Sequence, residues 1–402
     1  AALTFSGAAI ADEYQTLETT TVTAGRFEQD LMETPMSVSV ITADDIAKSG
    51  AQSIGALIES MTGVRINNDG GQGIKRAKIR GEDAFRSLVM IDGQKISEQK
   101  SMSGSPILID PAMVERIEVI KGPASVLYGS DAIGGAINII TKKGGTKPVQ
   151  GEVGANSGKS VNASVYGGVE GWKYRIGVAH EDGDNLKTPV GDMNHTKFNS
   201  TGANLFVSYD INEKATVGAT LDHFDLDFMS GSAEPGYEPF YVDVPEWKRT
   251  KVGAFSELRD LTASLKKVRL DVFYQKNDKD MLNHVQVAGM PLIIDNLADN
   301  SLDEYGLSIQ SDWAVLDSTF IVAGYEFNYD DLDAKSITHR MMPTGPTMST
   351  LFAKTGFFDG SMSTHALFAS AETNILDTVT LSYGARYTYV KSDMKDIHGS
   401  KV

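Results

Sequence analysis

Four glycines in the stretch KGPASVLYGSDAIGGAINI, residues 121–139, raise the question of a phosphate-binding loop. A loop of the Walker type needs G-x-x-x-x-G-K-[ST], because its lysine binds phosphate and its hydroxyl group binds magnesium. Gly129 and Gly134 have that spacing, but Gly135 and Ala136 stand where the lysine and the hydroxyl residue are required. No G-x-G-x-x-G pattern is present either. We therefore reject nucleotide chemistry for this stretch.

Other chemistries are excluded by composition. The 402 residues contain no cysteine, so disulfides, iron–sulfur clusters and thiolate zinc sites are ruled out. The formal charge of −16 argues against nucleic acid as a partner, because binding phosphates requires a basic face. No nucleophile–base pair or metal cluster emerges from the spacing of polar residues. We expect neither an enzyme nor a permanently bound cofactor or metal.

The glycine stretch is better explained as a packing device. Pro123 suits the first position of a one-turn helix, ASVLY, and Gly129 its left-handed end. The pair Gly134 and Gly135 lets the backbone pass close to another element before the strand AINIITKK.

Residues 40–145 carry mixed helix and strand signals. Thr42 with Asp45 resembles a capping box ahead of one short helix, and Ser53 can cap a second helix, IGALIESM. Asp110 followed by Pro111 predicts an N-cap and a single turn before the strand RIEVIKG. Two more apolar strands are predicted at 77–81 and 87–93. Together these signals predict a compact α+β domain of ordinary size.

From about residue 149 the pattern changes to period two. In TLSYGARYTYV, apolar and aromatic residues share one parity and polar residues share the other, and WKYRIGVA, ANLFVSY and YGLSIQSDW repeat this split. Tight turns such as YDINEKATV alternate with long polar segments at 182–198 and 227–247. Short turns on one side and long loops on the other favour a membrane-spanning β-barrel over a secreted sandwich.

The sequence VERIEVIKGPASVLYGSDAIGGAINIITKK resembles the end of the plug domain of TonB-dependent outer-membrane receptors. The segments SVSVITADDI, MTGVRI, IRG, MIDGQKI and IDPAMVERIEV follow the order of the plug pattern, and the match covers about residues 18–145. The resemblance implies an α+β plug domain inside a transmembrane antiparallel β-barrel of about 22 strands. We count about a dozen alternating segments, so we expect the chain to be a fragment with a complete plug and a partial barrel.

The domain division follows from these patterns. Residues 1–11 end in Ala9-Ile10-Ala11 before an acidic pair, which predicts the remainder of a secretory signal peptide. We expect a periplasmic N-terminal segment at 12–24, the plug domain at 25–147 and the N-terminal part of the barrel at 148–402. The location implied is the bacterial outer membrane, with lipid and lipopolysaccharide as neighbours, and we expect a monomer.

The segment LETTTVTAG resembles the TonB box, through which an inner-membrane motor acts by way of the protein TonB. An extended segment of threonine and valine can add as a strand to a partner's sheet edge. We predict that TonB binds the following seven residues: Glu18, Thr19, Thr20, Thr21, Val22, Thr23 and Ala24.

The resemblance also implies ligand contact at outward-facing plug loops. If the plug strands alternate in direction, the segments 67–78 and 97–106 lie on one side and 82–87 on the other. Cationic groups there suit an anionic iron chelate, because Arg and Lys form charge-assisted hydrogen bonds to its oxygens. Our candidates are Asn67, Asn68, Gln72, Lys75, Arg76, Gln99, Lys100, Ser101 and Met102.

Arg80 and Arg116 fall in plug motifs where family members hold the plug against barrel carboxylates. Glu372, on a predicted barrel strand, is a candidate counter-charge for such a lock. A buried ion pair is costly unless fully satisfied, so a lock of this kind suits a plug that must release.

The resemblance implies uptake of an extracellular iron complex into the periplasm, and we favour a ferric siderophore, in particular a catecholate. Haem is second, because histidine usually binds haem and no histidine precedes His180. His180, His195 and His223 lie near predicted outer loops, where a histidine is more often an ordinary surface residue. A cobalamin receptor is third. A passive porin or adhesin is the alternative of another class, but neither would need a plug and a TonB box.

Overall fold

The structure is a computed structural model of the 402-residue chain. It describes residues 21–23, 25–27, 29–30, 36–49, 53–68, 75–96, 109–156, 159–189, 191–231, 239–286, 289–316, 318–344, 347–376 and 379–401. The predicted signal-peptide remainder at 1–11 lies outside these residues.

A five-stranded sheet forms the centre of the plug domain, with strand order β3-β8-β9-β6-β7. Its strands are β3 (Val38–Thr42), β6 (Ser87–Ile91), β7 (Gln94–Lys95), β8 (Val114–Lys121) and β9 (Gly135–Thr141). Neighbours are antiparallel except β6 and β9, which run parallel. Every residue of β6 is buried, as is expected of a strand covered on both faces. The predicted strand at 87–93 is therefore confirmed, with Asp92 and Gly93 forming its turn.

Short helices begin where the capping residues predict. Thr42 and Asp45 exchange hydrogen bonds at the start of α1 (Ala43–Ser49). Ser53 accepts from the backbone N–H of Ala56 at the start of α2 (Ile54–Glu59). Asp110 caps the turn η2 (Pro111–Met113). The remaining helical turns are η1 (Ala84–Arg86), α3 (Ser125–Tyr128) and η3 (Ser130–Ala132).

Two features of the glycine stretch decide its conformation. The N-cap of α3 is Ala124, so Pro123 precedes the cap and does not occupy the first helical position as predicted. Gly135 has φ +147°, and a Cβ there would lie 2.2 Å from the carbonyl oxygen of Ile120. The second glycine therefore allows the close backbone approach that the sequence predicts.

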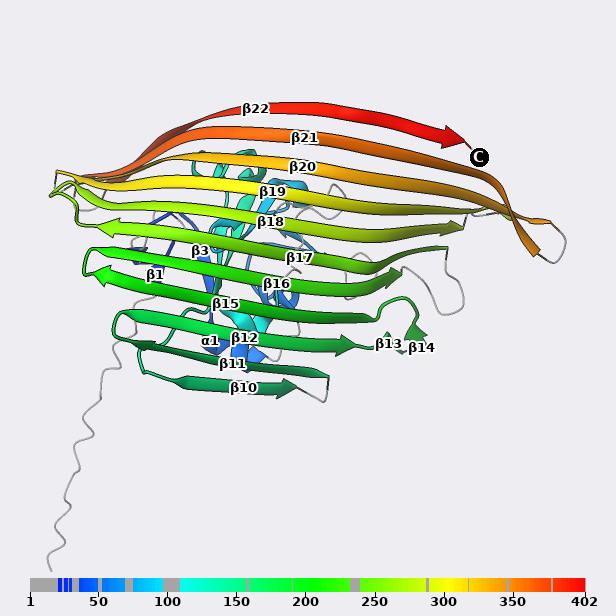
Figure 1. The fold of residues 1–402 in the computed structure, drawn as a ribbon, viewed down its shortest axis with the longest axis horizontal. Helices are drawn as coiled ribbons and strands as arrows, with labels where there is room; N and C mark the ends of the chain where they lie inside the picture. Colours follow the sequence, from blue (N-terminus) through cyan, green and yellow to red (C-terminus); the bar gives the residue numbers. More distant parts are fainter. Residues whose placement is uncertain are drawn as a thin grey trace, which may run out of the picture.

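An 11-stranded antiparallel sheet follows the plug, and consecutive strands are neighbours throughout (Figure 1). Its strands are β10 (Gln150–Asn156), β11 (Ser160–Val169), β12 (Trp172–Gly183), β15 (Phe198–Asn212), β16 (Ala215–Gly231), β17 (Phe240–Arg259), β18 (Leu265–Gln286), β19 (Ile293–Val315), β20 (Thr319–Thr344), β21 (Thr347–Leu376) and β22 (Val379–Lys401). A two-stranded ribbon, β13 (Leu186–Thr188) with β14 (Gly191–Met193), lies between β12 and β15. The later strands are far longer than the 9–11 residues that suffice to cross a bilayer.

The sheet alternates as the period-two pattern predicts. Ile176 of β12, Ile309 of β19 and Tyr387 of β22 are exposed on the face that points away from the plug. Arg175, next to Ile176, is only 3% exposed because its side chain lies on the plug side. The apolar face of the sheet thus points away from the plug and the polar face points toward it, which is the arrangement of a membrane barrel.

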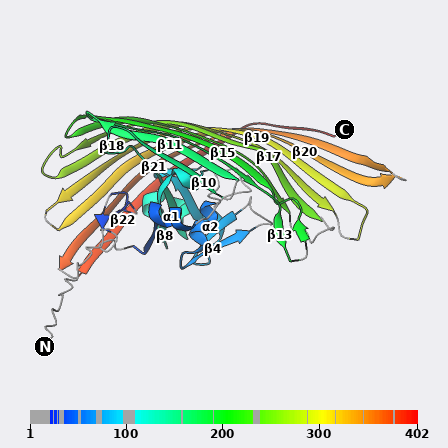
Figure 2. The ribbon, with the colours of Figure 1, turned by 90° about the horizontal axis from the view of Figure 1, so that it is seen from below.

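The plug packs on the concave side of the curved sheet (Figure 2). One hydrophobic core joins the two parts, since plug residues such as Ile66 and Ile117 cluster with Phe228, Val244 and Trp247 of the sheet. The plug hairpin β4 (Val64–Asn68) and β5 (Lys75–Ile79) belongs to this core. A second, two-stranded ribbon pairs β1 (Thr21–Val22) with β2 (Gln29–Asp30).

Connections of at most five residues join the strands at one end of the sheet, whereas those at the other end range from two residues, between β20 and β21, to fourteen, between β12 and β15. Residues 170–171 and 213–214 are tight turns, whereas 184–197 and 232–239 connect strands at the opposite end. The short turns at one end match the prediction, but the other end does not consist of long loops throughout, as was predicted. Within the described ranges, no helix has the length and apolar character needed to cross a membrane.

Candidate functional site

The predicted TonB box lies partly within the described residues. Thr21 and Val22 form strand β1, and the side chain of Val22 is fully buried. Glu18, Thr19, Thr20 and Ala24 lie outside the described residues. The visible part of the segment is therefore a short strand packed into the protein.

Thr23 is fastened to the plug by a buried carboxylate. Its backbone N–H and its hydroxyl both donate to Oε2 of Glu118, each at 2.9 Å. Glu118 is 0% exposed, and Nε of Arg116 donates to its other oxygen at 2.9 Å. The hydroxyl of Tyr128 donates to the Thr23 carbonyl at 3.2 Å. Burial raises the pKa of Tyr128, so its hydroxyl keeps the proton that it donates.

Arg26 ties the same segment to the barrel wall. Its guanidinium forms an ion pair with Glu326 of β20, and Nη2 of Arg386 of β22 lies 2.7 Å from the other oxygen of this carboxylate. The Arg26 guanidinium also lies 4.8 Å from the ring centre of Tyr128 and 4.5 Å from that of Phe368. Charge-assisted hydrogen bonds are stronger than neutral ones, and cation–π contacts are stronger where water is partly excluded than at an exposed site.

Three further contacts complete this arrangement. Nε2 of Gln310 donates to the carbonyl of Arg26 at 2.8 Å, and the rings of Phe27 and Phe320 lie 4.2 Å apart. Nη1 of Arg386 donates to the Leu127 carbonyl of α3 at 3.3 Å. Plug, N-terminal segment and barrel wall therefore meet at one place. We call five of these residues the N-terminal clamp: Thr23, Arg26, Glu118, Glu326 and Arg386.

The three residues predicted to form a plug–barrel lock are not brought together. Arg80 is exposed and forms no ion pair with a described residue, and its backbone has φ +52°. Arg116 pairs with Glu115 and Glu118 within the plug. Glu372 faces Phe320 across β20 and β21. The plug–barrel ion pair that is present uses Arg26 and Glu326 instead.

The predicted ligand loops are described only at their bases. Asn67 pairs with Arg76, and Asn68 with Lys75, at the end of the β4–β5 hairpin. In Figure 2 this hairpin extends toward the end of the sheet where β13 lies. The outward position of these loops stays a prediction. The candidates Gln72, Gln99, Lys100, Ser101 and Met102 lie outside the described residues.

The histidines predicted to lie near outer loops make local contacts, and two of them, His180 and His223, lie within strands β12 and β16. His195 stacks on Tyr241 at 4.2 Å, and Tyr241 stacks on His284 at 4.5 Å. Nδ1 of His180 lies 2.9 Å from the Thr201 hydroxyl, and Nδ1 of His223 lies 2.8 Å from the Thr250 hydroxyl. Among the described residues, no group of three His, Asp or Glu side chains could hold a metal ion.

The connection from plug to barrel is anchored by charge. Lys142 pairs with Glu152 of β10 at 2.9 Å, and Arg175 of β12 approaches the same carboxylate at 3.5 Å. Lys143 pairs with Asp92 at 3.0 Å. The C-terminal end of the plug is thereby held to the wall, as the N-terminal segment is by Arg26 and Glu326.

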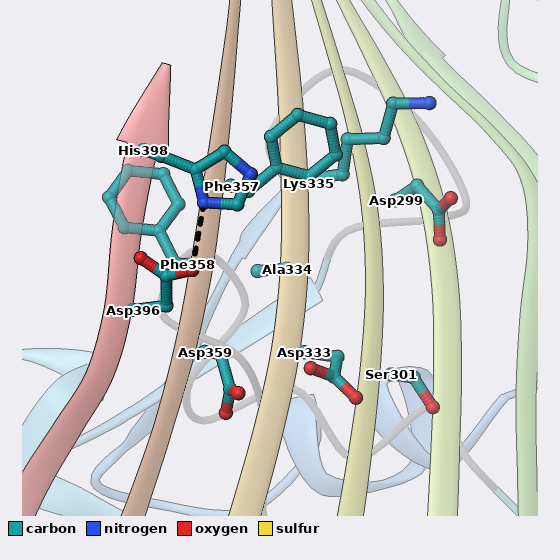
Figure 3. Close-up of a pocket in the computed structure, with 10 residues that line it drawn as sticks. All are labelled: Asp299, Ser301, Asp333, Ala334, Lys335, Phe357, Phe358, Asp359, Asp396 and His398. Atoms are coloured by element: carbon teal, nitrogen blue, oxygen red, sulfur yellow. Dashed lines mark hydrogen bonds and ion pairs between the residues drawn. The ribbon is translucent and has the colours of Figure 1, made fainter.

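A shallow cavity of about 340 Å³ lies on the outward face of β19 to β22, away from the plug (Figure 3). Four aspartates and Lys335 line it, and the ring of Phe357 stacks on His398 at 4.8 Å. Because the plug lies on the opposite face of the sheet, this cavity has no part in the clamp or in the predicted ligand loops.

The sequence predicted only part of the N-terminal clamp. Thr23 belongs to the predicted TonB box, but the partners Glu118, Glu326 and Arg386 were not predicted. Arg26 directly follows that box, which could have singled it out. Glu326 stands between Tyr325 and Phe327, so its parity already placed one carboxylate on the inward face.

Comparisons with known proteins agree on what this chain is similar to. A family model described as the TonB-dependent Receptor Plug Domain matches residues 30–136. The chain is 33% identical to a vitamin B12 transporter, BtuB, of Vibrio vulnificus over 56% of this chain and 39% of that protein. It is 40% identical to the BtuB of Vibrio cholerae over 33% of this chain and 22% of the relative. The chain thus spans well under half of these curated relatives.

A solved structure shows the same fold. The ferripyoverdine receptor of the outer membrane of Pseudomonas aeruginosa superposes with a TM-score of 0.72 at 16% identity, covering 95% of this chain and 55% of that one. The plug on a large antiparallel sheet is therefore a known architecture.

Proposed function

Because this chain carries the plug domain and part of the barrel of a TonB-dependent outer-membrane receptor, we propose that the whole protein actively imports a bulky metal complex. The cargo binds from outside and is released to the periplasm. TonB, driven by its inner-membrane motor, supplies the work. The observation that carries this proposal is the N-terminal clamp, which fastens the predicted coupling segment to the plug and to the barrel wall.

The clamp is suited to a segment that must be both held and released. Glu118 and Glu326 each accept from an arginine as well as from the N-terminal segment or its neighbour. When the segment leaves, Arg116 and Arg386 remain beside these carboxylates, so neither charge is left buried and alone. Residues 18–24 can then add as a strand to TonB.

Cargo contact is assigned to the plug loops at the extracellular end. The base of one loop carries Lys75 and Arg76, which follow an amide-rich strand end at Asn67 and Asn68. Residues 97–106 form the second proposed loop. Cationic and amide side chains suit an anionic or amide-bearing chelate.

Cobalamin is the first cargo we propose, because the curated relatives described above are named vitamin B12 transporters. Its peripheral amides match amide and cationic side chains equally well. A ferric siderophore, favoured by the sequence resemblance, is the second candidate, and haem the third.

Growth of a host that lacks its own receptors tests the proposal. The host carries the full-length gene. It receives cyanocobalamin as its only source of cobalamin, or a ferric siderophore from a panel, or haem, as its only source of iron. We expect growth on one of these and loss of growth when residues 18–24 are deleted. Deletion of the outer segment 184–188 is the matched control. Growth that survives the loss of 18–24 would instead support a passive porin.

A further inference from the structure

Exposed leucines stand at three of the short turns that join the strands at one end of the sheet. Leu261 lies between β17 and β18, Leu316 between β19 and β20, and Leu376 at the end of β21. Their side chains are 44%, 80% and 63% exposed. The turn between β15 and β16, at the same end, is made of Glu213 and Lys214 instead. We call Leu261, Leu316 and Leu376 the leucine rim.

Leu316 is the most unusual member of this rim. Its φ of +60° lies in the left-handed region, which glycine and asparagine adopt more readily than leucine. The hairpin that carries it is flanked by β18 on one side and by β21 on the other, so both of its strands are already paired. Neither the turn conformation nor burial therefore favours a leucine here. A strained residue of this kind indicates a functional contact.

Lipid does not account for Leu316. Membrane barrels carry aromatic residues where the lipid ends. At this end of the outward face, Trp172 of β12 and Tyr209 of β15 are register partners, and their ring centres lie 4.7 Å apart. Trp313 of β19 has the same parity as the outward residue Ile309. Leu316 follows Trp313 and stands in the turn, which places it on the water side of this aromatic boundary.

The N-terminal segment lies beside the same turn. Val22 of β1 belongs to one core cluster with Val322 of β20, close to the start of that strand. The rings of Phe27 and Phe320 lie 4.2 Å apart, and Phe320 is the second residue of β20. Figure 1 shows β1 toward the end of the sheet where the short turns lie. A partner that takes this segment is thereby brought next to Leu316.

We propose that the leucine rim is a second binding surface for TonB, which contacts the folded periplasmic domain whose sheet edge takes residues 18–24. This inference rests on the proposed function. Strand addition at the segment and apolar contact at the rim engage one domain at two places. The second contact then forms at a high effective concentration, so each strengthens the other.

The purified periplasmic domain of the host's TonB tests the rim, with full-length receptor in phospholipid nanodiscs. L316N should weaken binding about tenfold, because one leucine is no longer buried on docking. It should not lower the melting temperature, because asparagine adopts the φ of this turn more readily than leucine. E213N, which changes the neighbouring charged turn to the same residue, is the matched control and should bind within twofold of the parent.

A fluorescent label at the rim locates the contact. Leu316→Cys, in a full-length receptor without other cysteines, carries an environment-sensitive dye such as bimane. Its emission should shift to the blue when the TonB domain is added. After deletion of residues 18–24, the shift should need at least about tenfold more TonB domain, because the second contact is lost. The same dye at Glu213→Cys should not shift.

Equal binding by L316N and the parent, or an unchanged emission at position 316, would overturn the rim. Weaker binding together with a lower melting temperature would assign Leu316 a structural role and would also overturn it. If L316N does not assemble, L261N replaces it and should weaken binding by a smaller factor, because less of Leu261 is exposed. A parent receptor that binds no TonB domain would overturn the proposed function as well. Binding that needs residues 18–24 but ignores the rim would overturn this inference alone.

Discussion

Glu326 holds two guanidinium groups, and its chemistry determines how firmly the N-terminal clamp closes. Its side chain is 18% exposed, and those of Arg26 and Arg386 are 11% and 12% exposed. E326Q keeps the shape but leaves two cations without their carboxylate. We expect the segment to open more readily by about 1–3 kcal/mol, the usual cost of losing a charged partner in a half-buried site.

Tryptic cleavage after Arg26, followed by mass spectrometry, measures this opening. The rate should rise at least fivefold in E326Q. E152Q is the control, because Glu152 also binds two cations but at the other end of the plug. Equal cleavage rates in E326Q and the parent protein would show that the clamp does not restrain the segment.

Asp92 makes the stability of the plug depend on pH. It accepts from the backbone N–H and hydroxyl of Thr141 at 3.0 and 2.7 Å, and pairs with Lys143. Burial opposes its charge, but Lys143 and Thr141 hold the pKa of this carboxyl below its ordinary value. A lowered folded pKa means that the contribution is complete above the unfolded value of about 4, and is lost as pH falls through the folded pKa.

D92N removes this contribution while keeping the turn, because asparagine tolerates the φ of +52° found at this position. Urea unfolding of the plug should therefore show D92N less stable at pH 7. The difference in unfolding free energy between D92N and the parent protein should narrow as pH falls below about 4. A gap that stays constant over pH 3–7 would contradict this origin of the pH dependence.

At the residue scale, the sequence indicated side-chain types but not partners. The capping residues Thr42, Ser53 and Asp110 were predicted correctly, because a cap depends on contacts within four residues. The contact from Arg26 to Glu326 spans 300 positions and depends on the curvature of the sheet. No local pattern contains that information.

At the scale of the elements, the linker from plug to barrel packs against strands β11 and β12 through close backbone contacts at glycines. A Cβ on Gly168 of β11 would lie 2.3 Å from the carbonyl oxygen of Gly145, and one on Gly144 would lie 2.7 Å from the amide nitrogen of Tyr174. The obstacles are backbone atoms, which cannot turn away. The linker therefore lies flat on β11 and β12.

G168A should consequently lower the stability of the plug–wall contact by about 1–3 kcal/mol, as overpacking does elsewhere. G151A in β10 is the matched control, since its Cβ would meet nothing closer than 3.7 Å. The melting temperature of the detergent-solubilised receptor measures both. Identical melting of the two variants would mean that the linker can lift from the wall without cost.

Strand existence was predictable at this scale, but strand length was not. The parity of residues 380–389 correctly predicted that Arg386 of β22 faces inward, where it contacts Leu127 of the plug, while its neighbour Tyr387 is exposed. Strands β19 to β21 continue for 23, 26 and 30 residues because pairing persists beyond the apolar band. There the outward residues become polar, and a pattern based on hydrophobicity stops detecting the strand.

For the whole molecule, the outward face of the sheet determines whether it can lie in lipid. Leu205, Leu221 and Val252 are register partners on β15 to β17, and all three point away from the plug. Thr220, next to Leu221, points to the plug side. This pair of neighbours separates the lipid-facing surface from the interior within a single strand.

L221K should therefore impair assembly, because a lysine on the lipid face of a barrel costs about 2–4 kcal/mol near the bilayer centre. T220K is the control with the same charge at the adjacent inward position, where the polar interior accepts it at lower cost. The fraction that migrates as folded protein before heating, after refolding of the full-length receptor into phospholipid vesicles, measures the difference. In detergent micelles, whose thickness adapts, the two variants should be closer. Equal folded fractions in vesicles would mean that this face does not contact lipid, and the orientation of the whole sheet would have to be reversed.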